Sequence, residues 1–434
     1  MRFLDWGAPQ LENPVAMATN YCGFDRVLRA RQGLLEDPAD LRLASNLANA
    51  LWLQDALAEA LTWALWATRA SAANDVPVHS LAWRCLGNVL LDLGRFAEAD
   101  LAYRRADPLE RDHATQFNRS KVALGAANDA LAWRLAEHRL LGSRLPDGAY
   151  PGPWWVGWPA VDAVTIWAEQ GLGDTLQFLR WIPALVARGV SVRLLVQPPL
   201  QRVVARGLAW VGSGLLVEPH PGSALPRLHG CHGSLLSLPW LLEQPSTAWT
   251  QGWGYIRIPV AGRGSSTGRL RVGLVWAGGF QSDRHTRERD YRRKSVLGQS
   301  LRALLDGLLQ LPVDLVGLQV GPDRNPPELE GVPWADVLDP QADVLSLAEQ
   351  LMGIDLLLTV DTAAAHLAGA MGRPTWLLLP WAAASRWGRG SVATRWYPSL
   401  RLWRQPRHGD WFGLWPSVLK ALREEACETG SDSP

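Results

Sequence analysis

The stretch AVTIWAEQGLGDTLQFLRWIPALVARGVSVRLLV, residues 163–196, decides the fold of the larger part of this chain. It begins with a short apolar run, turns around Gly171 and Gly173, continues with helical spacing to Gly189, and ends in a second apolar run. Short apolar runs on either side of an amphipathic helix are typical of two buried strands in a parallel sheet. The stretch therefore predicts a βαβ unit of an α/β domain.

A second alternation of strands and helices begins after AGRGSSTGR, residues 261–269, whose composition is typical of an interdomain linker. In this part the apolar runs predict strands at 270–276, 313–318, 355–360 and 375–379. The spacing predicts helices near 300–310, near 345–351 and from Thr362 onward. Two successive Rossmann-like α/β domains are therefore expected.

The chain before residue 144 differs, since it has helical spacing and almost no strand signal. LAWRCLGNVLLDLGRFAEADLAYRRADP, residues 81–108, has apolar and small residues at the offsets of a tetratricopeptide helix-turn-helix. A second copy lies at 46–70 and a looser third at 118–140. The first two copies are further apart than the usual period of about 34 residues, which predicts an insertion at 71–79.

A connection rich in proline, glycine and tryptophan, residues 144–160, follows the helical region. We therefore predict three regions: tetratricopeptide-like helical repeats at 1–145, a first Rossmann-like domain at 146–262 and a second at 263–434. The fold class is α + α/β.

Composition excludes several classes of protein. The 434 residues carry 43 Lys and Arg against 42 Asp and Glu, so a net charge of +1 does not indicate a nucleic-acid-binding protein. The four cysteines show no CxxC spacing, which argues against a zinc site and a disulfide framework. No apolar run reaches 18 residues and the start does not read as a secretory signal. We expect a cytoplasmic protein without a membrane span.

In open α/β sheets, ligands bind outside the carboxyl ends of the strands. The first cluster at such a position is Glu169, Gln170, Gly171, Gly173 and Asp174, after the strand near 163–167. The glycines allow a sharp turn and a close approach of substrate to the backbone. Asp174 is placed either to cap the following helix or to act as a base.

The second cluster is Gly278 and Gly279, which end the strand near 270–276. A basic run follows them: Arg284, His285, Arg287, Arg289, Arg292, Arg293 and Lys294. Such a run suits phosphate oxygens, and it is also compatible with a solvated basic loop. The P-loop pattern GxxxxGK[ST] does not occur.

The third cluster is Asp361, Thr362 and His366 within LLLTVDTAAAHLAGAMGRPTWLLLP, residues 356–380. Asp361 and Thr362 end a buried strand and begin a helix, and His366 lies one turn further on the same face. Backbone amides at that helix start would form a pocket for a diphosphate. The alternative is a helix cap followed by a core histidine.

The motifs WAEQGLGDTLQFLRWIPAL, LLSLP, VGLVWAGG, LTVDTAAAHLAGAMGRPTWLLLP and RWYPSLRLWRQPRHGDW occur here in one order and register. In this combination the chain resembles the tetratricopeptide-linked glycosyltransferases similar to the ADP-heptose:lipopolysaccharide heptosyltransferases. That resemblance implies a GT-B pair of Rossmann-like domains, with the acceptor at the first and a nucleotide-sugar donor mainly at the second.

By position, the resemblance assigns Asp174 as the proposed catalytic base, with Glu169, Gln170, Gly171 and Gly173 in the acceptor-side loop. The donor-binding positions that it implies are Gly278, Gly279, Lys294, Gln319, Asp361, Thr362 and His366. Within this set, Lys294 would face the phosphates and Gln319 would lie near the base pocket. The chain departs from its relatives in the loop after Gly278, at Lys294-Ser295 and at Ser385.

The expected function is an inverting, metal-independent glycosyltransferase without a cofactor, acting on a polypeptide or glycan acceptor that the helical repeats could grip. Without a DxD motif, basic residues would stabilise the leaving diphosphate. The alternatives are a non-catalytic repeat scaffold with a degenerate GT-B body that binds a partner protein, and a nucleotide-sugar epimerase.

Overall fold

The computed structural model describes residues 22–70, 76–108, 111–142, 154–157, 161–220, 230–242, 254–259, 269–279, 285–339 and 342–431. Three expected segments lie mostly outside these residues: the insertion at 71–79, the connection at 144–160 and the linker at 261–269. The expected domain boundaries at 145/146 and 262/263 lie outside them as well. Those boundaries remain predictions.

The chain forms two compact units that do not follow the sequence in simple order. One unit contains Met1–Ser143 together with Gln281–Arg293 and Ala382–Arg389. The other contains Arg144–Phe280, Lys294–Trp381 and Gly390–Pro434. Two short segments from the C-terminal part of the chain therefore pack with the helical repeats.

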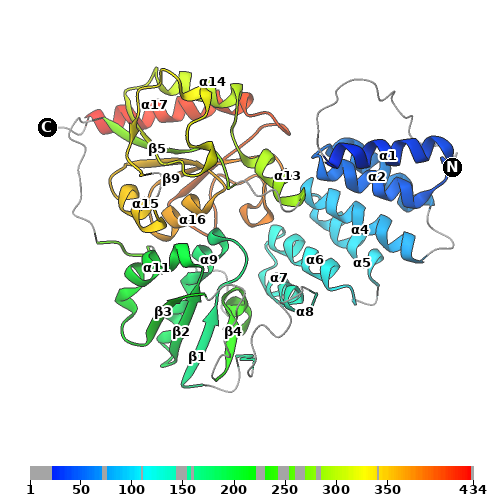
Figure 1. The fold of residues 1–434 in the computed structure, drawn as a ribbon, viewed down its shortest axis with the longest axis horizontal. Helices are drawn as coiled ribbons and strands as arrows, with labels where there is room; N and C mark the ends of the chain where they lie inside the picture. The colour runs from blue at the N-terminus through cyan, green and yellow to red at the C-terminus, as the bar shows by residue number, and fades with distance from the viewer. Residues whose placement is uncertain are drawn as a thin grey trace. The chain divides into compact units, whose positions relative to one another are not determined.

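The first unit is an array of helices that stack side by side in sequence order (Figure 1). They are α1 (Cys22–Glu36), α2 (Leu41–Leu53), α3 (Leu57–Ala70), α4 (Val76–Asp92), α5 (Phe96–Ala106), α6 (His113–Gly125), α7 (Asp129–Ala136) and α8 (His138–Gly142). The three expected helical pairs correspond to α2 with α3, α4 with α5, and α6 with α7. The helical-repeat region is thus confirmed.

Small residues let these helices approach closely. A Cβ on Gly87 of α4 would lie 2.6 Å from the ring of Tyr103 on α5, and one on Gly125 would lie 2.5 Å from Phe96. Gly87 thus faces its partner helix, whereas Gly125 of α6 faces α5 of the preceding pair.

Asp40 caps the start of α2, where its side chain accepts from the amides of Arg42 and Leu43.

The first α/β domain, in the second unit, has a parallel sheet of four strands. The strands are β1 (Ala163–Trp167), β2 (Ser191–Val196), β3 (Leu215–Pro219) and β4 (His232–Ser234), in the order β3-β2-β1-β4. The helices in these described residues include α9 (Leu172–Phe178), α10 (Ile182–Val186), α11 (Gln201–Gly207) and α12 (Leu238–Leu241). The βαβ unit expected at 163–196 is confirmed, with Ile166 of β1 paired to Leu194 of β2.

The second α/β domain has a parallel sheet of six strands in the order β10-β9-β8-β5-β6-β7. The strands are β5 (Leu270–Val275), β6 (Val313–Gly317), β7 (Ala335–Asp336), β8 (Leu356–Val360), β9 (Thr375–Leu379) and β10 (Leu400–Arg404). Read from β7, this order corresponds to 3-2-1-4-5-6, which is the Rossmann arrangement. Both expected Rossmann-like domains are therefore confirmed.

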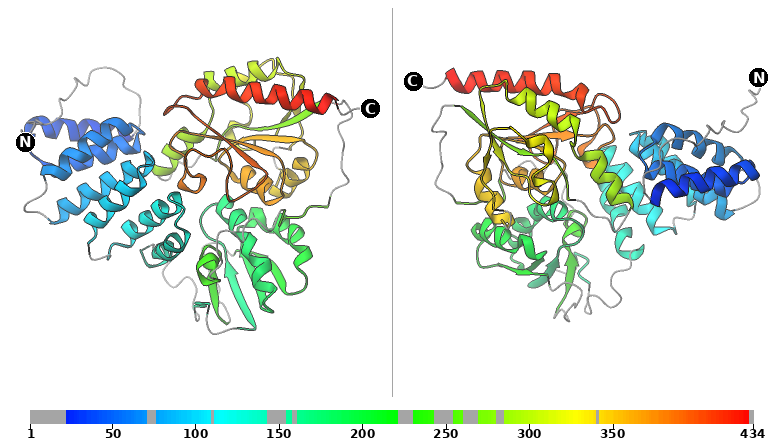
Figure 2. Two further views of the ribbon diagram at one scale, coloured as in Figure 1. Left: turned by 180° about the vertical axis from the view of Figure 1, so that it is seen from behind. Right: turned by 45° about the horizontal axis from the view of Figure 1, so that its top comes forward.

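Helices cover both faces of the second sheet (Figure 1). α14 (Gln299–Leu308) and α17 (Trp415–Ser431) lie on one side, and α15 (Val344–Leu351) and α16 (Ala363–Ala370) on the other. Figure 2 shows the same layering from behind and with the top of the molecule tilted toward the viewer. Strand β8 is buried along its whole length, as a central parallel strand should be. Of the helices described, none has both the length and the apolar character that a bilayer crossing requires.

Candidate functional site

The site follows from where the strand order reverses in the second sheet. From β5 the chain proceeds to β6 on one side, whereas from β8 it proceeds to β9 on the other. Loops that leave two such neighbouring strands diverge, and ligands of open α/β sheets bind in the crevice between them. Gly278 and Gly279 follow β5, and Asp361 and Thr362 follow β8, so both donor-side clusters lie at this switch point.

The first sheet has a corresponding switch point between β1 and β4. The acceptor-side loop, Glu169 to Gly171, follows β1, and Ser234 ends β4. The Ser234 hydroxyl donates a hydrogen bond to the Glu169 carboxylate and so joins the two loops. The sequence-predicted loops thus lie at the carboxyl edges of both sheets.

Lys294, the last residue of α13 (His285–Lys294), lies across the backbone of Gly278. A Cβ on Gly278 would be 2.7 Å from Lys294 Cε and 3.4 Å from Nζ. The Gly278 amide donates to the hydroxyl of Ser295 at 3.1 Å, which fixes the loop beneath the lysine. Within the described part of the chain, Lys294 Nζ has no carboxylate partner. The structure therefore brings Gly278 and Lys294 together at the end of β5, and no carboxylate of the described residues pairs with this ammonium.

Gln319, which follows β6, is 4% exposed and hydrogen-bonds to the backbone of the loop that follows β5. Its side-chain oxygen accepts from the amides of Trp276 and Ala277, both at 3.0 Å. Its amide nitrogen donates to the carbonyls of Ala277 and Val320 at 3.3 and 2.9 Å. With both ends bonded to backbone, Gln319 shapes the loop before Gly278 rather than presenting a free amide to a ligand.

Asp361 and Thr362 begin α16. Thr362 is the N-cap, yet its side chain makes no capping hydrogen bond; its hydroxyl lies 3.4 Å from that of Thr359. The interpretation of this pair as a side-chain cap is therefore not what the structure shows. The carboxylate of Asp361 lies near the histidine of α16, with Oδ1 3.8 Å from His366 Nε2.

His366 is buried, with 3% of its surface exposed. Its Nδ1 lies 2.9 Å from the hydroxyl of Tyr397, and its ring packs against α9, where a Cβ on Gly173 would be 2.7 Å from His366 Cδ2. Only a glycine at position 173 permits this approach between α9 and α16. The ring is thus enclosed by protein, which gives it a role in holding Asp361 and the two helices.

The acceptor-side loop is a strained turn. Gln170 has φ of 63°, in the left-handed region that few non-glycine residues adopt. Gln197, just after β2, donates to the Gln170 carbonyl at 3.4 Å and accepts from the Thr175 hydroxyl at 2.9 Å. The amide of Gly171 donates to Asp174 Oδ2 at 3.2 Å, so Asp174 does cap the start of α9. Asp174 remains half-buried, with part of its surface accessible.

Two arginines of the basic run are neither phosphate ligands nor solvated. Arg289 donates to Asp92 Oδ2 at 3.1 Å and lies 4.0 Å above the Trp52 ring. Arg293 donates to the same oxygen at 3.0 Å and to Asp55. These carboxylates belong to the helical repeats, and they neutralise both arginines. Arg284 lies outside the described residues, as do the side chains of His285 and Arg287.

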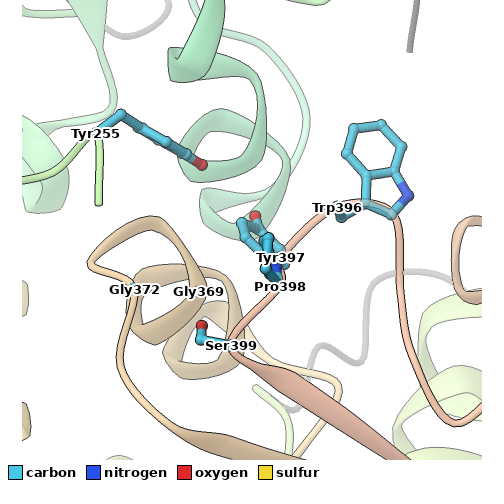
Figure 3. Close-up of a pocket in the computed structure, with 7 residues that line it drawn as sticks. All are labelled: Tyr255, Gly369, Gly372, Trp396, Tyr397, Pro398 and Ser399. Atoms are coloured by element: carbon cyan, nitrogen blue, oxygen red, sulfur yellow. The ribbon is translucent and has the colours of Figure 1, made fainter. Parts of the chain in front are cut away.

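Sequence reasoning missed the residues that support the site. Ser295 and Gln197 occur singly after a helix and a strand, without a motif. Tyr255 and Tyr397 lie outside the regular elements, and they meet only in the fold, together with Gly369, Gly372, Trp396, Pro398 and Ser399 around a small pocket at the end of α16 (Figure 3). The free volume of this pocket, ≈ 10 Å³, is about that of one water-sized sphere. It is too small for a nucleotide-sugar.

Across the residues that the structure describes, no three His, Cys, Asp or Glu side chains lie together in a group that could hold a metal ion.

The chain is similar to several known proteins. No protein-family model matches it. Protein FlbA of Caulobacter vibrioides is 26% identical over 398 residues, covering 81% of this chain and 62% of FlbA. The chain therefore spans about three fifths of the length of that curated relative.

Among solved structures, the heptosyltransferase WaaC of Escherichia coli with ADP is 16% identical, with 62% of this chain and 99% of that chain covered and a TM-score of 0.39. The O-GlcNAc transferase of Thermobaculum terrenum is 15% identical, with 93% and 89% covered and a TM-score of 0.29. A heptosyltransferase and a glycosyltransferase with a longer matched region are thus among the structures that the chain resembles.

Proposed function

We propose that this chain is an inverting glycosyltransferase of the GT-B type that binds the diphosphate of a nucleotide-sugar between the loops after β5 and β8. The observation that carries the proposal is Lys294, whose ammonium is held across Gly278 with no carboxylate partner among the described residues. A half-buried cation without a counter-ion favours an anionic ligand. The backbone start of α16, where no side chain caps the helix, adds a positive field on the other side of the switch point.

Asp174 on α9 is the base in this proposal. Its carboxylate takes the proton of an acceptor hydroxyl, and the resulting oxygen attacks the anomeric carbon of the sugar. The bond from that carbon to the diphosphate breaks, and the nucleoside diphosphate leaves with the bonding electron pair. Attack opposite the leaving group inverts the anomeric centre. The hydrogen bond from the Gly171 amide orients Asp174 before reaction.

Lys294 and the amides at the start of α16 stabilise the negative charge that develops on the leaving diphosphate. In this role they supply what a divalent cation supplies in other transferases, so we propose a reaction that needs no metal and no cofactor. Gln319 and His366 act as supports for the two loops, since both are buried and bonded to protein.

The acceptor is proposed to be a polypeptide or a glycan that reaches the loop between Glu169 and Asp174. A polypeptide acceptor is supported by the helical repeats, because stacked helical pairs present an extended surface to bind peptides.

The experiment is a comparison of the wild type with Asp174→Asn, assayed for nucleoside diphosphate binding by calorimetry and for sugar transfer to a peptide and glycan panel. We expect Asp174→Asn to abolish transfer and to leave the dissociation constant of the nucleoside diphosphate within about twofold, because the change removes the base and not the cation. Transfer by Asp174→Asn at the wild-type rate would exclude Asp174 as the base.

A non-catalytic repeat scaffold is the second candidate, and one observation favours it. Asp174 already has a local use as the cap of α9, so its presence does not by itself require catalysis. A wild-type protein that binds no nucleotide and transfers no sugar, yet retains its fold, would support this candidate.

A further inference from the structure

A line of buried polar side chains connects the two helices on which the proposed function depends. It begins at Tyr255, which is 7% exposed and whose hydroxyl lies 2.7 Å from the carbonyl oxygen of Leu176 and 3.5 Å from that of Gln177, both on α9. A carbonyl oxygen only accepts, so the hydroxyl proton of Tyr255 is donated to α9. Burial raises the pKa of Tyr255, which keeps this proton in place at neutral pH.

Tyr397 forms the next link. Its hydroxyl lies 2.9 Å from His366 Nδ1. Tyr397 and Tyr255 line the same small pocket. Figure 3 shows the hydroxyl ends of the two tyrosines directed toward the same region.

His366 completes the line on α16. Its Nε2 lies 3.8 Å from Asp361 Oδ1, at the switch point after β8. Tyr397 thus bonds the histidine of α16, and Tyr255 bonds the carbonyl of Leu176, which is two residues beyond Asp174 on α9.

Arg180 fixes the orientation of both tyrosine rings. Its guanidinium carbon lies 5.3 Å from the centroid of Tyr255 and 4.9 Å from that of Tyr397, and its Nη1 donates to the carbonyl of Trp396 at 2.9 Å. Phenylalanine at positions 255 and 397 would pack equally well. Ring packing therefore does not explain why both residues carry a buried hydroxyl.

We propose that His366, Tyr397 and Tyr255 form a positioning relay that holds the start of α16, at the donor side, in register with α9, which carries Asp174. The catalytic part of this inference rests on the proposed function: the relay would set the distance between the Asp174 carboxylate and a sugar bound at the start of α16. The three residues are positioning residues, since they contact neither the sugar nor the diphosphate in this account.

The first test uses the protein without any ligand. Histidine ring ¹⁵N shifts, with His366 assigned by comparison with His366→Gln, should change at Nδ1 in Tyr397→Phe, because that variant removes its hydrogen-bond partner. An unchanged His366 Nδ1 signal would contradict the relay.

The second test is hydrogen exchange, again without ligand. Tyr255→Phe and Tyr397→Phe each remove one buried hydroxyl, and we expect the amides of α9 to exchange roughly two- to tenfold faster in both, as for the loss of one hydrogen bond. The matched control is Tyr103→Phe, which removes an equally buried hydroxyl that donates to Asn88 in the helical repeats. Unchanged exchange in α9 for both relay variants, or an equal effect of Tyr103→Phe, would contradict the relay.

The third test measures transfer. Both relay variants should lower kcat by roughly three- to tenfold with the donor KM within about twofold, because a misplaced base slows chemistry more than it weakens donor binding. A change in the donor KM with kcat unaltered would contradict a positioning role. Absence of nucleotide binding by the wild type would count against the proposed function alone, since the two ligand-free tests decide the relay separately.

Discussion

Arg293 and Lys294 are adjacent in the sequence and belong to one basic run, yet their surroundings differ completely. Arg293 is buried between Asp55 and Asp92 of the helical repeats. Lys294 lies over Gly278 and has no carboxylate partner in the described part of the chain. The basic run thus contains arginines that pair with distant carboxylates and a lysine that pairs with none among the described residues. The difference lies in whether a carboxylate from another part of the chain comes within ion-pair distance.

The largest effect is expected at the buried side of this comparison. Asp92→Asn should lower the free energy of unfolding by about 3–5 kcal/mol, because it leaves Arg289 and Arg293 buried without full compensation. Chemical denaturation followed by circular dichroism measures this.

Asp290→Asn is the matched control for that change, since Asp290 also pairs with Arg289, at 3.1 Å, but its side chain is 55% exposed. A surface pair of this kind contributes about 0–1 kcal/mol. Equal losses in the two variants would contradict the structural role assigned to Asp92.

Lys294→Ala tests the other side. We expect it to weaken nucleoside diphosphate binding by roughly 10- to 100-fold, the loss of a charge-assisted hydrogen bond of about 1.5–3 kcal/mol, with stability within about 0.5 kcal/mol of the wild type. Calorimetric titration gives the affinity. Arg292→Ala is the control from the same helix, because Arg292 is exposed and pairs with Glu288 at 3.6 Å. Equal weakening by both would mean that general positive charge, rather than Lys294, attracts the ligand.

A subtler change distinguishes the two glycines after β5. A Cβ on Gly278 would displace the Lys294 side chain, whereas one on Gly279 meets nothing within 4 Å. We expect Gly278→Ala to weaken nucleoside diphosphate binding by roughly three- to tenfold, a part of the Lys294 contribution, and Gly279→Ala to leave it unchanged. The same titration decides it, and a larger loss for Gly279→Ala would place the ligand differently.

Acidification gives the smallest effect near neutral pH. Burial would raise the pKa of Asp92, but Arg293 and Arg289 outweigh it and hold that pKa below its ordinary value. A depressed carboxyl pKa stabilises the folded state above the unfolded value of about 3.9, and this stability is lost as the pH falls through the folded value. Stability should therefore be insensitive to Asp92 between pH 6 and 8. Below about pH 4 it should fall more steeply in the wild type than in Asp92→Asn; parallel acid curves would contradict the ion-pair account.

The fold could be predicted from the sequence wherever a period was strong. The βαβ unit at 163–196, strand β9 and the three helical pairs came from spacing alone. The strand order, which places the glycine and Asp361 loops at a switch point, came from the structure. β3 and β10 were not predicted, since Leu216 is exposed and Arg401 interrupts an otherwise buried strand. Short edge strands of mixed polarity carry little local signal.

The division within the basic run could not be predicted, because Arg293 and Asp92 are 201 residues apart in the sequence. Tyr255 and Tyr397 were missed for the same reason. Each lies in an irregular segment. The role of the two tyrosines depends on His366, which only the tertiary structure brings close to them. Local patterns identify strands and turns, whereas charge partners and buried hydroxyl chains are products of the fold.

The most direct test of the central claim is a thermal-shift screen of the wild type against nucleoside diphosphates and nucleotide-sugars, with and without EDTA. A ligand at about 100 times its dissociation constant stabilises the folded state by about 2.7 kcal/mol, which is readily seen as a rise in Tm. We predict a rise with one nucleotide that is insensitive to EDTA and absent in Lys294→Ala. No rise with any nucleotide would contradict the donor site and favour a scaffold whose helical repeats bind a partner protein.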